Sequence, residues 1–222
     1  ELRFFIQFFH NHGLLNVADR PQWYVIPKGS RSYLPPLIKP FEQNIHVNAD
    51  IRAVTRHPDN VQIDFQDGTS QTFDEVVFAC HSDQALALLG DPTENEKNIL
   101  GAIPYSTNSV VLHTDKKLLP LRKTAWASWN YQLSTDRHKA ASVTYNMNIL
   151  QGLESEHTFC VTLNQKEDID PNHILQEFTY YHPVFSADSI KAQKKRDHIC
   201  GHNHSHFVGA YWHNGFHDIQ KS

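Results

Sequence analysis

Histidines are frequent in this chain, and their densest group stands near its C-terminal end. The sequence holds 16 histidines among 222 residues, and four of them fall in His198-Ile-Cys-Gly-His-Asn-His-Ser-His206. On a strand, His202, His204 and His206 would share one face and could meet a zinc or copper ion. The spacing matches no standard zinc signature, and no second group of ligands complements it. We therefore expect no metal site and interpret the run as histidines on a solvated strand edge.

Nucleophilic catalysis has little support in the residue pattern. Cys80 and His81 are adjacent, and strand neighbours point to opposite faces, so they cannot form a thiolate–imidazolium pair without a sharp turn. No Gly-x-Ser-x-Gly elbow occurs, and Lys28-Gly-Ser-Arg31 lacks the glycine spacing of a phosphate loop. We interpret Cys80 as a small buried hydrophobic residue, and the sequence identifies no catalytic base.

Aromatic residues are concentrated in Ala125-Trp-Ala-Ser-Trp-Asn-Tyr131 and recur at Tyr211-Trp212. Core packing is the default interpretation of such side chains. The polar Ser128 and Asn130 between the rings are equally compatible with a wall that faces a ligand pocket. On the second interpretation, Trp129, Tyr131 and Trp212 would line a substrate pocket without acting as acid or base.

The elements that must position these residues follow from hydrophobic periodicity and turn signals. Asp67-Gly68 is typical of a hairpin turn, and the apolar run that ends at Ala79 is typical of a strand buried on both faces. The patterns predict an α+β fold, with a hairpin-plus-strand unit first and a mixed or antiparallel sheet with helices second. Helices are expected at 2–12 (buried), 31–39, 82–89, 92–100, near 173 and at 186–195. Strands are expected at 45–49, 51–57, 61–65, 72–79, 109–114, 125–133, 142–148, 158–163, 178–182 and 206–212.

Composition excludes several classes of protein. Apolar residues make up 40% of the chain and charged residues 20%, and no apolar run reaches the roughly 18 residues of a membrane-spanning helix. The 20 basic and 24 acidic residues nearly cancel, which disfavours nucleic-acid binding. Three cysteines are too few for a secreted disulfide scaffold, so we expect a cytoplasmic protein. Because Met147 is the only methionine and the chain opens at Glu1 without a signal peptide, we expect a piece of a longer protein.

Several motifs taken together resemble a known family. The first group resembles the central part of flavin-containing amine oxidases: Gly29-Ser-Arg-Ser-Tyr33, Ile45-His-Val-Asn-Ala-Asp-Ile-Arg-Ala-Val54, Asp67-Gly68 and Phe73-Asp-Glu-Val-Val-Phe-Ala79. The second group resembles bacterial proteins of that superfamily that are predicted to bind NAD or FAD: Ala79-Cys-His-Ser-Asp-Gln-Ala85, Leu112-His-Thr-Asp115, Ala125-Trp-Ala-Ser-Trp-Asn-Tyr131 and Phe207-Val-Gly-Ala-Tyr-Trp212. The likeness extends over almost the whole chain.

The resemblance implies a two-domain FAD/NAD(P)-binding fold with a Rossmann-like flavin domain. It implies that 1–104 is the distal part of the flavin domain, with the hairpin, a strand and flanking helices. It also implies that 105–205 is a substrate domain with an antiparallel sheet plus helices, and that 206–222 is a C-terminal strand beside the flavin. The family's Gly-x-Gly-x-x-Gly motif, which holds the FAD pyrophosphate, does not occur in these 222 residues, and we expect it upstream of Glu1. Lys28 stands where the family usually has a glycine, and 219–222 depart from its pattern.

The resemblance also assigns contacts with FAD to named residues. Ile51 matches the position that reaches the adenine, and Ala79 matches the end of the strand beneath the dinucleotide. The segment along the flavin ring is matched by Gly209, Ala210, Tyr211, Gly215, Phe216 and His217.

Two functions stay open at this stage. The leading hypothesis is an FAD-dependent oxidoreductase that removes hydride from a small apolar or amine substrate, with this chain as an incomplete fragment of it. We expect FAD in the full-length parent, and we expect this chain alone to be colourless because the pyrophosphate motif is absent. The alternative is a non-catalytic α+β binding module, or a remnant, that works without flavin. If the N-terminal βαβ unit of the family is missing from this chain, the apolar run Val76-Val-Phe78 lacks the parallel strands that would cover it. We therefore expect the chain to form a homodimer or to aggregate through this run.

Overall fold

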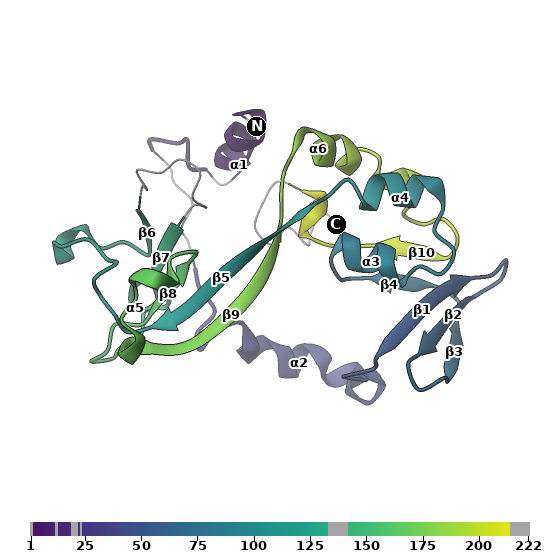
Figure 1. The fold of residues 1–222 in the computed structure, drawn as a ribbon, viewed down its shortest axis with the longest axis horizontal. Helices are drawn as coiled ribbons and strands as arrows, with labels where there is room; N and C mark the ends of the chain where they lie inside the picture. The colour runs from purple at the N-terminus through teal and green to yellow at the C-terminus, as the bar shows by residue number, and fades with distance from the viewer. Residues whose placement is uncertain (1, 12, 19–21, 23, 133–141, 214–222) are drawn as a thin grey trace. The chain divides into compact units, whose positions relative to one another are not determined.

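The computed structural model describes residues 2–11, 13–18, 22, 24–132 and 142–213, in which helices and sheets occur together (Figure 1). This confirms the α+β fold class. Contacts divide the chain into two compact units: unit 1 comprises Glu1–Gln22, Ile45–Tyr105 and Pro183–Ser222, and unit 2 comprises Trp23–Asn44 and Ser106–His182. The resemblance implied a first range at 1–104 and a second at 105–205. The structure instead groups 23–44 with unit 2 and groups 183–205 with unit 1. The assignment of ranges to a flavin domain and a substrate domain stays a prediction.

Unit 1 contains the hairpin that the sequence predicts. Strands β1 (Ile51–Arg56), β2 (Val61–Phe65) and β3 (Ser70–Phe73) form an antiparallel sheet in that order. In the β2–β3 turn, Gly68 has a φ of +86°, and the carboxylate of Asp67 accepts a hydrogen bond from the backbone N–H of Thr69 at 2.9 Å. The strand expected at 45–49 is wrong, because 47–48 form a turn in which Asn48 has a φ of 54°. Asparagine tolerates this left-handed conformation better than most residues.

A second sheet of unit 1 pairs two segments that are far apart in the chain. Strand β4 (Val76–Phe78) lies parallel to β10 (Ser205–Phe207), and the rings of Phe78 and Phe207 stack with centroids 5.2 Å apart. The single strand expected at 72–79 is therefore wrong: β3 and β4 belong to different sheets. The strand expected at 206–212 is also too long, because 210–212 form a 3₁₀ helix, η7 (Ala210–Trp212).

Three short helices complete the core of unit 1. Helices α3 (Ser82–Leu88), α4 (Glu94–Leu100) and α6 (Ala187–Gln193) confirm the helices expected there. The N-cap of α3 is His81. The buried core comprises Val54, Val61, Phe78, Ala85, Leu89, Ile99, Leu100, Ile103, Ala192, Ile199, Phe207, Tyr211 and Trp212.

Helix α1 (Leu2–Asn11) confirms a helix at the start of the chain, but its expected burial is wrong. Leu2 is 72% exposed and Phe5 is 53% exposed. The apolar residues of this segment therefore specify a helix without placing it in the core.

Unit 2 is built on a five-stranded sheet in the order β6-β7-β8-β5-β9. Its strands are β5 (Tyr105–His113), β6 (Trp129–Gln132), β7 (Ser142–Asn146), β8 (Cys160–Leu163) and β9 (Ile174–Pro183). The pairs β6–β7, β7–β8 and β8–β5 are antiparallel, as expected for this part of the chain. The helices of the unit are α2 (Leu34–Ile38), which follows η1 (Ser30–Tyr33) and precedes η2 (Lys39–Asn44), and α5 (Met147–Gln151).

Three strands of unit 2, β6, β7 and β8, are shorter than the sequence predicts, and β8 begins at Cys160 rather than at 158. Strands β5 and β9 begin earlier than the expected 109 and 178. Residues 123–125 form a 3₁₀ turn, η3 (Lys123–Ala125), so that β6 begins only at Trp129. Strand β7 ends at Asn146, whose side chain caps α5 by accepting a hydrogen bond from the backbone N–H of Ile149 at 3.2 Å. The short helix expected near His173 is the 3₁₀ helix η5 (Pro171–His173).

In the part of the chain that the structure describes, no helix has both the length and the apolar character needed to cross a bilayer.

Candidate functional site

The carboxyl ends of β4 and β10 bring two predicted binding segments together. Phe78 and Phe207 are paired at the ends of the strands, and the backbone N–H of Val208 donates to the carbonyl of Phe78 at 2.9 Å. Ala79 and Gly209 therefore follow neighbouring strands at one edge of the pair. In open α/β sheets, ligands bind outside the carboxyl ends of parallel strands. This edge is the first candidate site.

The residues at this edge leave its backbone accessible. Ala79 and Ala210 are exposed, and Gly209 between the strand end and η7 is half-buried. None of the three has a side chain that extends beyond Cβ. A flat ligand could therefore lie close to the peptide groups, which fits the role that the resemblance implies for these positions.

Gly209 is also required by the packing of the next turn. A Cβ atom at this position would stand 2.4 Å from Cε1 and 2.7 Å from Cδ1 of Tyr211, well inside van der Waals contact. The Tyr211 ring folds back over the glycine, and the Trp212 indole N–H donates to the carbonyl of Phe207 at 2.9 Å. Tyr211 is 4% exposed and Trp212 is 3% exposed, so both belong to the core of unit 1.

The hydroxyl of Tyr211 is a buried polar atom with no hydrogen-bond partner among the described residues. Burial raises the pKa of Tyr211 far above its ordinary value, and nearby Tyr105, Cys80 and Cys200 raise it further. The phenol is therefore neutral at any physiological pH.

Cys80 and His81 form no catalytic pair in this arrangement. The His81 ring stacks on the Tyr105 ring with centroids 4.4 Å apart, and the Tyr105 hydroxyl accepts a hydrogen bond from the backbone N–H of Ser82 at 2.9 Å. Burial raises the pKa of the Cys80 thiol, which keeps it protonated. Sequence reasoning missed Tyr105, because its contacts with 81–82 arise only when the chain folds.

The other predicted cofactor residues lie away from this edge or outside the described residues. Ile51 begins β1, pairs with Phe65 in the three-stranded sheet and is 38% exposed. Gly215, Phe216 and His217 fall in 214–222, outside the part of the chain that the structure describes. Their roles stay predictions.

Trp129 and Tyr131 stand on one face of β6, because side chains alternate along a strand. Trp129 is 46% exposed and Tyr131 is 62% exposed, whereas Asn130 between them is buried and donates to the carbonyls of Ala127 and Thr144. The two rings border a cavity of about 500 Å³ in unit 2. Its lining comprises Lys117, Leu118, Leu119, Pro120, Leu121, Ala125, Ala127, Trp129, Asn130, Tyr131 and Gln132. Trp212 is held in the core of unit 1, and a pocket role for it stays a prediction.

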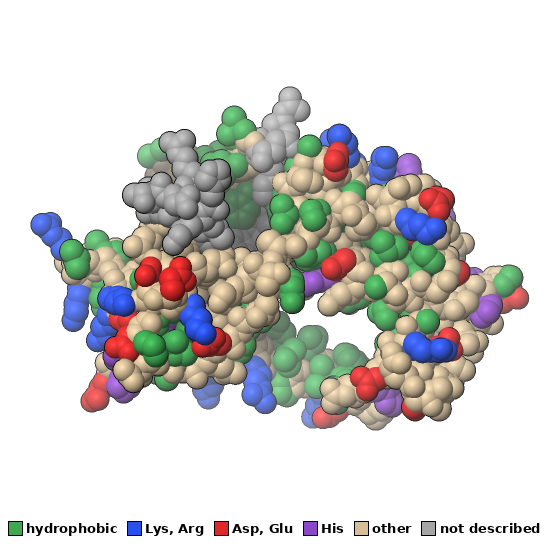
Figure 2. Space-filling view, in the orientation of Figure 1, with side chains coloured by type: hydrophobic (Ala, Val, Ile, Leu, Met, Phe, Trp, Pro, Cys, Tyr) green, Lys and Arg blue, Asp and Glu red, His purple; other side chains and the backbone are tan. Residues whose placement is uncertain are grey.

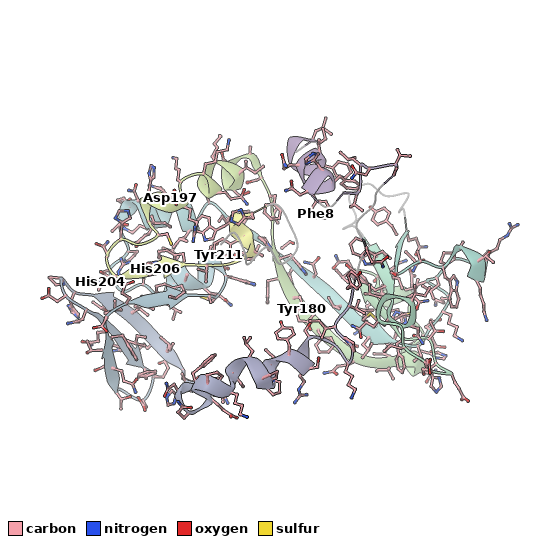
Figure 3. The ribbon with its side chains drawn as sticks, turned by 180° about the vertical axis from the view of Figure 1, so that it is seen from behind. Phe8, Tyr180, Asp197, His204, His206 and Tyr211 are labelled. Carbon is pink, nitrogen blue, oxygen red and sulfur yellow. The ribbon has the colours of Figure 1, made fainter. Side chains whose placement is uncertain are left out.

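The histidine run does not form one strand face. Strand β10 covers only 205–207, and His204 before it has a φ of 56°. His202 contacts the carbonyl of Asp197 at 3.1 Å, His204 contacts the carbonyl of Pro58 at 3.0 Å, and His206 pairs with the carboxylate of Glu75 (Figure 3). The described residues contain no group of three or more His, Cys, Asp or Glu side chains placed to hold a metal ion.

Comparison with known proteins gives one family match. The family model for flavin-containing amine oxidoreductases matches residues 17–165. No curated protein sequence matches the chain.

Three solved structures illustrate the fold that this chain shares with known proteins. The chain is 18% identical to the CLA-producing fatty acid isomerase from P. acnes, covering 87% of this chain and 49% of that one, with a TM-score of 0.62. Wild-type putrescine oxidase bound to putrescine is 9% identical, with coverage of 85% and 50% and a TM-score of 0.55. Reduced UDP-galactopyranose mutase is 11% identical, with coverage of 77% and 43% and a TM-score of 0.53. The chain spans half the length, or less, of these structures, and at such identities the likeness concerns the fold alone.

Proposed function

Because the chain belongs to the family of flavin-containing amine oxidoreductases, we propose that it functions in an FAD-dependent oxidoreductase that removes hydride from a small apolar or amine substrate. The observation that carries the proposal is the edge where β4 and β10 end side by side. Ala79 and the segment that begins at Gly209 follow the ends of these two strands. The resemblance assigns contacts with FAD to both. Such an edge is where open α/β folds bind their ligands.

In this proposal, the described residues orient the cofactor through their backbone. Ala79, Gly209 and Ala210 offer peptide groups without bulky side chains, so that a planar ring system can approach them closely. When bound, FAD supplies the hydride-accepting ring, and the protein supplies orientation and a partly apolar surround. A thiolate from Cys80 plays no part, because burial keeps the thiol protonated.

The substrate would contact Trp129 and Tyr131. Their half-exposed rings border a cavity of about 500 Å³, a size in the range of small-molecule sites. Aromatic walls suit apolar chains and the alkyl parts of amines. The neighbouring Asn130 is held by Ala127 and Thr144 and is therefore a structural support.

Anaerobic flavin reduction tests the proposed reaction. The protein and FAD are mixed with a panel of primary amines, polyamines and unsaturated fatty acids, and bleaching of the visible flavin absorbance is followed. We expect bleaching by one chemical class. Replacing Trp129 and Tyr131 by Ala should raise the substrate concentration needed for half-maximal rate about ten-fold or more, because each ring buries a large apolar area. Absence of both saturable FAD binding and bleaching would favour the alternative, a non-catalytic binding module that works without flavin.

A further inference from the structure

The segment 116–123, here called the basic loop, combines positive charge with apolar side chains. It connects β5 to β6 and has the sequence Lys-Lys-Leu-Leu-Pro-Leu-Arg-Lys, with four basic and no acidic residues among eight. The whole chain carries a formal charge of -4, so this loop is a positively charged segment in a chain whose net charge is negative.

Buried leucines anchor the basic loop and present one apolar side chain outward. Leu118 is 9% exposed and Leu119 is 5% exposed, and Leu118 packs with Val111 and Ile169 in the core of unit 2. Leu121 is 104% exposed, which is the highest value among the exposed large hydrophobic residues that the structure describes. Leu121 is therefore a fully exposed side chain on a loop that two buried leucines anchor in the core of unit 2.

Hydrogen bonds hold the backbone of the basic loop in place. The backbone N–H of Leu119 donates to the carbonyl of Lys116 at 3.0 Å, and that of Ala125 donates to the carbonyl of Arg122 at 2.9 Å. The Trp126 indole N–H donates to the carbonyl of Pro120 at 2.7 Å. The position of Leu121 is therefore set by the fold of unit 2.

The basic side chains of the basic loop form no ion pairs within the part of the chain that the structure describes. Lys116, Lys117, Arg122 and Lys123 are all exposed, and none of them forms an ion pair with a described carboxylate. Asp115 is next to the loop, but it is 8% exposed, and its oxygens accept hydrogen bonds from the backbone N–H groups of Lys117 and Asp170. Figure 2 shows blue basic and green hydrophobic side chains together at the left of the view, where the teal segment between β5 and β6 lies in Figure 1.

Exposed aromatic rings continue this surface. Trp129 and Tyr131 border the cavity of about 500 Å³ whose lining also includes 117–121 of the basic loop. The Lys123 ammonium stands 5.9 Å from the centroid of the Trp126 ring. Tryptophan and tyrosine beside basic residues are typical of protein surfaces at the level of lipid head groups.

We propose that the basic loop docks unit 2 on an anionic lipid bilayer. Leu121 would enter the boundary between head groups and acyl chains, while Lys116, Lys117, Arg122 and Lys123 would lie near the lipid phosphates. A surface site of this kind needs both contributions, an inserted apolar side chain and electrostatic attraction to anionic lipid. A nucleic acid would satisfy the charges but not the exposed leucine. This inference goes beyond the proposed redox function and does not depend on it.

Vesicle co-sedimentation tests the proposal with vesicles of pure phosphatidylcholine and vesicles that also contain phosphatidylglycerol. We expect the protein to bind the anionic vesicles selectively and to lose affinity as salt is raised. Each basic residue near an anionic surface contributes about a five-fold factor, so Lys116→Gln/Arg122→Gln should bind about 25-fold more weakly. The matched control, Lys194→Gln/Lys195→Gln, removes two exposed charges from unit 1 and should bind like the unaltered protein.

The apolar contribution is tested separately. Leu121→Ser should weaken binding to anionic vesicles about ten-fold, because it removes the inserted side chain without changing charge. In Leu121→Trp, anionic vesicles should shift the tryptophan emission to shorter wavelength, and phosphatidylcholine vesicles should not. Thermal melting shows that each variant is folded. Three results would overturn the proposal. Absence of binding by the unaltered protein would mean that it does not dock, and equal binding to both kinds of vesicle would mean non-selective adsorption. Equal losses in the loop and control variants would mean a general charge effect.

Discussion

Arg56 on β1 and Glu96 on α4 form a buried ion pair in which each side chain is 2% exposed. Two parallel hydrogen bonds join them, from Nη1 to Oε1 at 2.6 Å and from Nη2 to Oε2 at 2.9 Å. Arg56 also donates from Nε to Asp91 at 2.8 Å, and Glu96 accepts from the backbone N–H of Thr93 at 2.7 Å. The pair therefore fixes the hairpin sheet to α4 with its hydrogen-bonding capacity largely satisfied.

Loss of one partner of this pair should destabilise unit 1 strongly. Arg56→Met leaves the carboxylate of Glu96 buried without its counter-charge, which should lower the free energy of unfolding by about 3–5 kcal/mol. Denaturant unfolding measures the loss. Lys191→Met is the control, because its ion pair with Asp188 is exposed and should contribute less than about 1 kcal/mol. A loss in Arg56→Met as small as that of the control would contradict the role of the buried pair.

The same pair should make stability depend on pH in the acid range. Burial by itself raises the pKa of Glu96, but hydrogen bonds from Arg56 and Thr93 and the charge of Arg56 outweigh it and hold the pKa below its ordinary 4.5. The stabilising contribution is therefore complete above about pH 4.5 and is lost as the pH falls through the lowered pKa. We expect the difference in unfolding free energy between the unaltered protein and Glu96→Gln to shrink over this range. A constant difference would show that Glu96 does not titrate in this way.

Gly209→Ala should displace the Tyr211 ring from the core. The added Cβ would lie 2.4 Å from Cε1 of the ring, so that the ring must shift, and the free energy of unfolding should fall by about 1–3 kcal/mol. A double-mutant cycle with Tyr211→Leu tests the cause, because Gly209→Ala should be much less destabilising when the ring is absent. Equal effects in both backgrounds would mean that another contact requires the glycine.

Self-association through β4 stays a prediction, and the exposure and pairing of this strand identify the residue to test. Val77 is 59% exposed, and β10 is the one strand paired with β4 among the described residues. We expect light scattering to give a mass above 25.6 kDa for the unaltered protein and a lower mass for Val77→Lys. Val184→Lys, at another exposed valine of unit 1, is the control. A monomer that persists at high concentration would rule out this contact.

The sequence predicted those elements that depend on turn residues and hydrophobic periodicity within one short segment. The hairpin around Gly68 and the helices expected at 82–89 and 92–100 follow from turn residues and period. The structure contains the hairpin, and it has the helices at 82–88 and 94–100. The division of 72–79 into β3 and β4 could not be predicted in this way. It depends on the pairing of Val76–Phe78 with β10, which lies far away in the chain.

The candidate site was predictable only in part. The resemblance pointed to Ala79 and to the segment 209–211, and the structure brings these positions to one edge. No sequence signal indicated that Tyr105 would contact 81–82, or that Trp212 would be held in the core by the carbonyl of Phe207. Such contacts depend on how segments pack, and an aromatic residue in a core has the same local pattern as one that lines a pocket.

Titration of FAD into the protein, followed by flavin fluorescence, tests the central claim that FAD binds at the edge formed by the ends of β4 and β10. When a Gly-x-Gly-x-x-Gly segment is joined to the chain to hold the pyrophosphate, we expect saturable binding that is at least about ten-fold weaker in Ala79→Trp and in Ala210→Trp, because a large ring at either exposed alanine would block the approach to the backbone. Ala87→Trp, at an exposed position of α3, should bind FAD like the unaltered protein. No saturable binding, or equal affinity in all four proteins, would contradict the account.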